Sequence, residues 1–154
     1  MSKLYVNELH PKTTGSAVLM PNKPLASVSR SVDMAAATGT AYPTIIFNQI
    51  DLDVGGNYNS GNGVFTCPIS GIYQVTCFGM DSTSDAAGAF YLRLERNGVN
   101  YGSDCGSYSS ANSHAGASGT WIIQCSVNDT LEISYYATSG VTGTYTGATF
   151  MLIG

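Results

Sequence analysis

The sequence predicts an all-β domain, a sandwich or barrel of roughly eight to ten short strands. Apolar and polar side chains alternate over short segments, which is the period of a half-buried strand. Clusters of Gly, Asn, Ser and Pro separate these segments at regular intervals. An amphipathic helix pattern is absent from the sequence, since Gly39 interrupts even the Ala-rich residues 34–41.

The first half of the domain supplies four expected strands. Residues 26–34 alternate, and residues 44–54 form a near-continuous apolar run that ends at the Gly- and Asn-rich residues 55–63. Segments 63–68 and 71–80 follow as two strands joined by a short Pro-Ile-Ser-Gly turn. Turn residues therefore bound each of these segments.

The second half is expected to pair locally and then to close the sheet. Residues 89–96 alternate strictly and meet the next strand through Asn97-Gly98, the strongest short hairpin signal. The remaining strands are expected at residues 99–102, 120–127, 130–137 and 148–154. The last segment is apolar, so we expect it in the centre of a sheet.

Residues 1–24 are expected to form a short β stem in front of a head that spans residues 25–154. Segments 4–9 and 16–21 each have the character of a short strand, with a turn between them. Two isolated strands cannot stabilise themselves in water. We therefore expect this stem to pack on its own head, on copies of itself or on another protein.

Charge is sparse and unevenly distributed. Charged residues make up 10% of the chain, against about a quarter in typical domains. All three lysines, Lys3, Lys12 and Lys23, precede a head that holds most of the acidic residues. An acidic head is a poor partner for nucleic acid, because phosphate binding requires clustered Lys and Arg. Whether the asymmetry has a purpose or surface charge is merely scarce stays open.

We expect neither a membrane segment nor a secretory leader from the sequence. No apolar run approaches the ~20 residues that cross a bilayer, so we expect no membrane insertion. The start, MSKLYVNELHPK, lacks the apolar core of a signal peptide. The four cysteines lack CxxC spacing, and we expect reduced, mostly buried thiols at Cys67, Cys77, Cys105 and Cys125.

No residue pattern indicates an enzyme or a bound cofactor. The glycine-rich residues 55–63 lack the Lys and Ser/Thr of a phosphate-binding loop and precede a strand, so a hairpin loop is the better interpretation. His114 lies near Asp104, Cys105 and several serines, but nothing positions a base or an oxyanion hole. We therefore expect a binding or structural module.

Two long loops rich in Gly, Ser and Thr are expected at residues 102–119 and 138–147. They contain Tyr108, His114 and Tyr145. Tyrosine among small polar residues is typical of antibody contact loops, in which the ring supplies area and the small residues adapt. These three residues are candidates for recognition, and the alternative is that both loops merely connect strands.

The run from residue 47 to residue 73 resembles the signature of the C1q-like domain. That pattern asks for Phe, five residues, Asp or Asn, four residues, an aromatic, six residues, Phe, five residues and Gly-x-Tyr-x-Phe-x-aromatic. Every gap matches at Phe47, Asp53, Tyr58, Phe65, Gly71 and Tyr73. Val75 and Cys77 depart from it, since they stand where Phe and an aromatic are usual.

The resemblance covers about residues 25–154 and implies a ten-stranded jelly-roll sandwich, shared with the tumour necrosis factors, that assembles as a homotrimer. It also implies aromatic residues in the core or close to the threefold axis, namely Phe47, Tyr58, Phe65, Tyr73 and Phe150. Family members often hold calcium in loops, and the loop acids Asp81, Asp85 and Asp104 are candidates. Their spacing is not that of an EF-hand, and the alternative is that they are simply solvated.

The stem resembles, in style and order, the openings of bacteriophage fibre and virion surface proteins, particularly those of marine phages. This resemblance implies a trimeric virion structural protein, a tail fibre or a capsid-decorating fibre, assembled in the host cytoplasm. Residues 1–24 would then dock on other virion proteins, and the head would face a host surface glycan or protein. The alternative is a soluble, secreted C1q/TNF-like or lectin-like binding protein.

Overall fold

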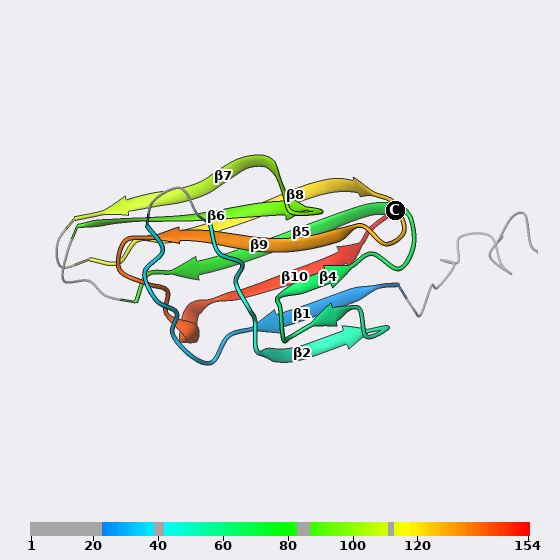
Figure 1. Ribbon diagram of the computed structural model, residues 1–154, viewed down its shortest axis with the longest axis horizontal. Helices are drawn as coiled ribbons and strands as arrows, with labels where there is room; N and C mark the ends of the chain where they lie inside the picture. Colours follow the sequence, from blue (N-terminus) through cyan, green and yellow to red (C-terminus); the bar gives the residue numbers. More distant parts are fainter. Residues whose placement is uncertain (1–22, 39–41, 83–86, 111–112) are drawn as a thin grey trace, which may run out of the picture.

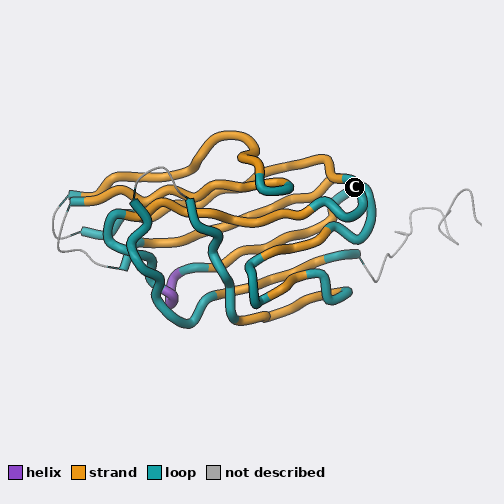
Figure 2. The backbone as a smooth tube through the Cα atoms, in the orientation of Figure 1, coloured by secondary structure: helices purple, strands orange, loops and turns teal. Residues whose placement is uncertain are grey.

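A computed structural model of the chain describes residues 23–38, 42–82, 87–110 and 113–154. They form two five-stranded antiparallel sheets, one on the other (Figures 1 and 2). The strands are β1 Leu25–Ser29, β2 Gln49–Val54, β3 Tyr58–Asn59, β4 Val64–Thr66, β5 Gly71–Met80, β6 Gly88–Arg96, β7 Val99–Ser109, β8 Gly116–Cys125, β9 Thr130–Ala137 and β10 Gly147–Leu152, with the short 3-10 helix η1 at Gly143–Tyr145. The expected stem, residues 1–24, lies almost entirely outside the described residues.

The first sheet has the strand order β2-β1-β10-β5-β8 and the second has β3-β4-β9-β6-β7. The prediction of an all-β, ten-stranded jelly-roll sandwich is confirmed. The apolar C-terminal strand β10 lies between β1 and β5 in the centre of its sheet, as its composition predicts. Asn97-Gly98 forms the predicted hairpin between β6 and β7.

The core is organised around aromatic rings from both sheets. Phe65 of β4 stacks on Phe150 of β10 with ring centroids 5.2 Å apart and an interplanar angle of 3°. The ring centroid of Tyr58 lies 6.0 Å from that of Phe150, and the ring centroid of Tyr73 lies 6.0 Å from that of Phe65. Phe47 extends the series through Tyr58 at 6.4 Å. All five rings are buried within one chain, so they leave no ring surface for a neighbouring subunit.

The apolar run 44–54 crosses from one sheet to the other, which explains why its strand begins late. Thr44 bridges to Ser134 of β9 in the second sheet, whereas Gln49 pairs with Ser29 of β1 in the first. Ile45 between them is fully buried. The apolar run therefore consists of a crossover over residues 44–48 and then strand β2.

The long loop expected at residues 102–119 is mostly strand, and that prediction was wrong. β7 runs to Ser109 and β8 begins at Gly116. Small residues are needed in this strand because large rings of the neighbouring strand cover it. A Cβ on Gly106, for example, would collide with the ring of Tyr91 on β6. The low hydrophobicity of this edge strand therefore made its sequence look like that of a loop.

The four cysteines are free, with Cys67, Cys77 and Cys125 buried and Cys105 half-buried. Burial raises the pKa of the Cys67, Cys77 and Cys125 thiols above the ordinary value. Because the thiolate is the reactive form, these three side chains are protected both by packing and by protonation.

We predict that a thiol reagent at pH 8 labels at most Cys105 rapidly in the native protein, and all four cysteines after denaturation without reductant. Mass spectrometry of the labelled chain counts the modified sites. Four fast-reacting thiols in the folded protein would contradict the buried positions, and a missing thiol after denaturation would reveal a disulfide.

We predict that Tyr73→Ala lowers the free energy of unfolding by about 3–5 kcal/mol, because it removes a buried ring from the aromatic core. Tyr73 also donates a hydrogen bond from its hydroxyl to the Ile69 carbonyl at 2.8 Å. Tyr73→Phe should cost about 0.5–1.5 kcal/mol, the loss of that bond alone. Chemical denaturation measures both, and equal losses would show that the ring contributes nothing.

Candidate functional site

The three candidate recognition residues lie in different settings. Tyr108 lies in β7, a strand rather than a loop, and is 79% exposed. His114 follows in the connection to β8, and Tyr145 lies in η1 with 57% of its surface exposed. Tyr108 contacts the ring of Tyr91, whereas His114 contacts Asp81. The described contacts do not join the three residues into one site.

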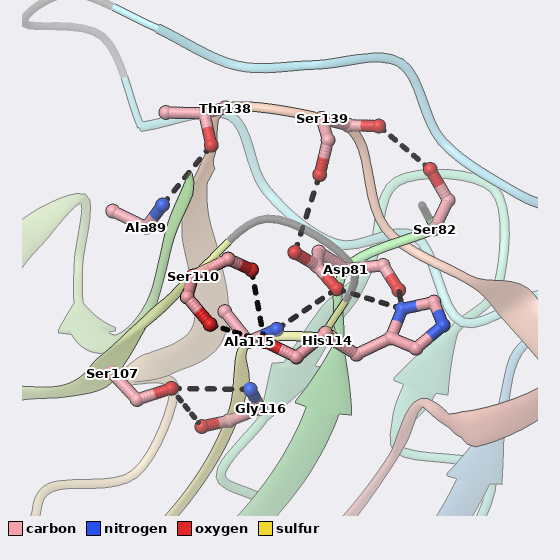
Figure 3. Close-up of polar contacts among 11 residues, drawn as sticks. Asp81, Ser82, Ala89, Ser107, Ser110, His114, Ala115, Gly116, Thr138 and Ser139 are labelled. Atoms are coloured by element: carbon pink, nitrogen blue, oxygen red, sulfur yellow. Dashed lines mark hydrogen bonds and ion pairs between the residues drawn. The ribbon is translucent and has the colours of Figure 1, made fainter. Parts of the chain in front are cut away.

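Asp81, the residue after β5, is the centre of a polar cluster (Figure 3). Its carboxylate is fully buried. One oxygen lies 3.0 Å from His114 Nδ1 and accepts a hydrogen bond from the backbone N–H of Ala115, also at 3.0 Å. The other accepts a bond from the Ser139 hydroxyl at 3.3 Å.

This cluster holds three connections together. The backbone N–H of Asp81 donates to the Ala115 carbonyl, and the Ser82 hydroxyl donates to the Ser139 carbonyl at 2.7 Å. The end of β5, the connection between β7 and β8 and the connection between β9 and η1 are thereby fixed to one carboxylate. A buried carboxylate requires such partners, so the cluster has a structural explanation.

The cluster does not assemble a hydrolytic triad among the described residues. A triad needs a serine hydroxyl against the ring nitrogen of histidine that faces away from the carboxylate. Here the Ser139 hydroxyl donates to Asp81 itself. Sequence reasoning linked His114 with Asp104, but Asp104 forms its ion pair with Arg93.

Two of the candidate calcium acids, Asp81 and Asp104, are engaged by different partners. Asp81 is occupied by the contacts above, and Asp104 accepts two hydrogen bonds from the Arg93 guanidinium at 2.8 and 2.9 Å. The bond from Arg93 lowers the pKa of Asp104 below its ordinary value. Asp85 lies outside the described residues. Within the described ranges, no three metal-ligating side chains gather.

The outer face of four strands of the first sheet is a broad surface without charge, and the carboxylates Asp51 and Asp53 lie on the fifth, the edge strand β2. Strands β1, β10, β5 and β8 contain no Asp, Glu, Lys or Arg. Alternation directs Ile72 and Phe78 of β5 and Ile122 of β8 outward, with the hydroxyls of Thr76 and Thr120 3.1 Å apart between the strands. The exposed large apolar residues on this sheet and at its ends include Ile50, Leu52, Ile72, Phe78, Ile122 and Ile153. The alternation of residues along β5 and β8 in the sequence was the signal that could have indicated this surface.

The two ends of the sandwich differ in what they carry. The backbone N–H of Ile72, at the start of β5, donates to the Gly154 carbonyl, and that of Leu152 donates to the Pro24 carbonyl. The start of β1 and the C-terminus therefore lie at the same end of the sandwich (Figure 1), which we call the stem end after the expected stem of residues 1–24. Asp81 directly follows Met80, the last residue of β5, at the opposite end, which we call the distal end.

The matching positions of the C1q-like signature have direct physical roles. The Asp53 carboxylate accepts hydrogen bonds at 3.0 Å from the backbone N–H groups of Asn57 and Tyr58, which closes the turn after β2. The Tyr58 hydroxyl accepts a bond from the backbone N–H of Phe47 at 3.0 Å. Val75 and Cys77, where larger side chains are usual, are fully buried. The departures are therefore accommodated within the core.

Among the described residues, no helix is long and apolar enough to cross a membrane. No curated protein matches the chain. Solved structures match it: the globular domain of zebrafish complement 1qA protein (18% identity, TM-score 0.66, 86% of this chain and 98% of that one), murine APRIL (10%, 0.63, 85% and 99%) and Eiger TNF from S. frugiperda (8%, 0.60, 86% and 94%). These likenesses show the fold.

The family model described as the C1q domain matches residues 27–151, which is most of the chain. The match contains the aromatic core, the Asp53 turn and both complete sheets except the first two residues of β1 and the last of β10. The chain therefore belongs to the C1q domain family.

Proposed function

We propose that the protein is a homotrimeric binding and structural module, without enzymatic activity, that serves as a fibre of a bacteriophage virion. The observation that carries the trimer is the uncharged outer face of the first sheet. Depletion of charge, with apolar residues at the centre, distinguishes the core of a protein interface from ordinary surface. Monomers seldom expose large contiguous apolar surface.

Three copies that bury this face around one axis would cover Ile72, Phe78 and Ile122. The five aromatic residues of the core cannot provide the contact, because each chain already buries them. The interface would instead be built from the outward-facing positions of β5 and β8. Threonine and glutamine between the apolar side chains can hydrogen-bond across it without the desolvation cost of charge.

The virion role rests on the stem and on the polarity of the head. A chain anchored through residues 1–24 leaves the head at the stem end, so the distal end faces away from the particle. The sparse charge and the abundance of Gly, Ser and Thr suit a rigid exterior β-protein. Four free cysteines suit folding in a reducing host cytoplasm. The head would attach the particle to a host surface.

We predict that Ile122→Arg converts the trimer to a monomer, because it places a charge in the interface of every copy. Light scattering should show the mass falling from three chains to one chain of 16.1 kDa. Val32→Arg is the matched control, since Val32 is 53% exposed and Ile122 is 52% exposed, but Val32 lies outside both sheets. A wild-type monomer at micromolar concentration, or a trimeric Ile122→Arg variant, would refute this interface.

We predict that deletion of residues 1–22 leaves a folded, trimeric head that no longer enters virions. The deletion spares Pro24, whose carbonyl accepts the hydrogen bond from Leu152. Mass spectrometry of purified particles measures incorporation, and circular dichroism and light scattering measure the head. Truncated heads on virions would refute the anchoring role, and an unfolded head would refute the division between stem and head.

A further inference from the structure

Four tyrosines form a connected surface on the outer face of the second sheet. Tyr42, Tyr136, Tyr91 and Tyr108, which we call the tyrosine patch, follow one another with ring centroids 6.0, 5.9 and 5.8 Å apart. Their planes are tilted by 40°, 57° and 84°. The patch therefore presents ring faces and ring edges in series, each with a hydroxyl.

The register of three strands builds this patch. Tyr91 of β6 lies opposite Tyr136 of β9 on one side and opposite Gly106 of β7 on the other. Because Gly106 has no side chain, the Tyr91 ring lies over it and reaches Tyr108, two residues further along β7. Interaction with the Tyr108 hydroxyl raises the pKa of Tyr91 to about 12.

Packing of the sheet explains part of this arrangement but not all of it. Cross-strand aromatic pairs such as Tyr91 and Tyr136 stabilise a sheet. Tyr108, however, lies on the edge strand and is 79% exposed. A large ring so exposed contributes little to the core, so its function is better sought outside the chain.

Charged groups beside the patch are engaged with one another or with hydroxyl groups. The Arg93 guanidinium lies 3.6 Å from the centre of the Tyr42 ring and is bound to Asp104 through two hydrogen bonds. Glu95 accepts a bond from the Ser134 hydroxyl at 2.6 Å, and Glu132 accepts one from Thr44 at 2.7 Å. One arginine among three carboxylates leaves the surface acidic, which disfavours an anionic ligand.

The position of the patch keeps it free in the proposed trimer. It lies on the second sheet, whereas the uncharged face belongs to the first, on the other side of the core. Tyr108 and Tyr136 are each next to the last residue of their strands, toward the distal end. No pocket is formed in the described part of the chain, so the patch suits an extended ligand lying across a flat surface.

We propose that the tyrosine patch binds a neutral glycan chain. Sugar rings present apolar C–H faces that pack on aromatic rings, and hydroxyls that exchange hydrogen bonds with tyrosine hydroxyls and carboxylates. Tyrosine offers both kinds of contact at a low entropic cost. The acidic surroundings, with their single engaged arginine, select against sulfated or sialylated chains. As a host receptor the glycan rests on the proposed attachment function, but its binding is a property of the isolated protein.

Affinity gel electrophoresis of the full-length protein tests this proposal, with mannan, dextran or arabinogalactan in the gel and heparin as the anionic contrast. At least one neutral polysaccharide should retard the wild-type protein, and heparin should not. Tyr108→Ala should raise the dissociation constant for that polysaccharide about tenfold or more, as for the truncation of a central aromatic contact. The dissociation constant of Tyr108→Phe, which keeps the ring, should stay within about threefold of the wild-type value.

Tyr145→Ala is the matched control, because Tyr145 is also exposed but lies in η1, outside the patch, and it should bind as wild type does. Tyr91→Ala provides a second test inside the patch if Tyr108→Ala alters assembly. No retardation by the three neutral polysaccharides, retardation by heparin alone, or equal binding by wild type and both patch variants would overturn the proposal. Light scattering on the same samples reports the trimer separately, so the two proposals can fail independently.

Discussion

The stacking of aromatic rings between the two sheets constrains most other features of this chain. Phe65 and Phe150 come from opposite sheets and lie nearly parallel in contact, so the spacing between the sheets is set by aromatic rings. Tyr58 and Phe47 extend this contact to the crossover before β2, and the Asp53 carboxylate fixes the turn that positions Tyr58. Aromatic rings bury large areas in defined geometries, so few substitutions could preserve this arrangement.

Because the aromatic signature is used inside each chain, both outer faces are free to differ. The first sheet presents uncharged apolar and hydroxyl side chains, and the second presents tyrosines beside an ion pair. Alternation along β5 separates the core from the outer face of the first sheet, since Tyr73, Val75 and Cys77 face inward and Ile72 and Phe78 face outward. One sandwich can thus carry the proposed assembly surface on one side and the proposed binding surface on the other.

The sequence predicted those parts of the structure that depend on local pattern or on a fixed motif. Alternation located β5, β6 and β9, and the spacing from Phe47 to Tyr73 identified the aromatic core. The segment around Gly106 escaped this reasoning, because a strand of Gly and Ser at a sheet edge has neither alternation nor hydrophobicity. The tyrosine patch and the Asp81 cluster depend on strand register and on contacts between distant segments, which no local pattern contains.

The shared position of residue 24 and the C-terminus also determines how the head would respond to mechanical load. β1 begins at the stem end and is paired along its length with both β2 and β10. A pull on the stem, opposed by a ligand held near the distal end, would act along the axis of β1. The hydrogen bonds on both sides of that strand would then share the force in shear, whereas a pull across the strand would break them one after another. This geometry favours a head that stays folded under tension applied through its N-terminal side.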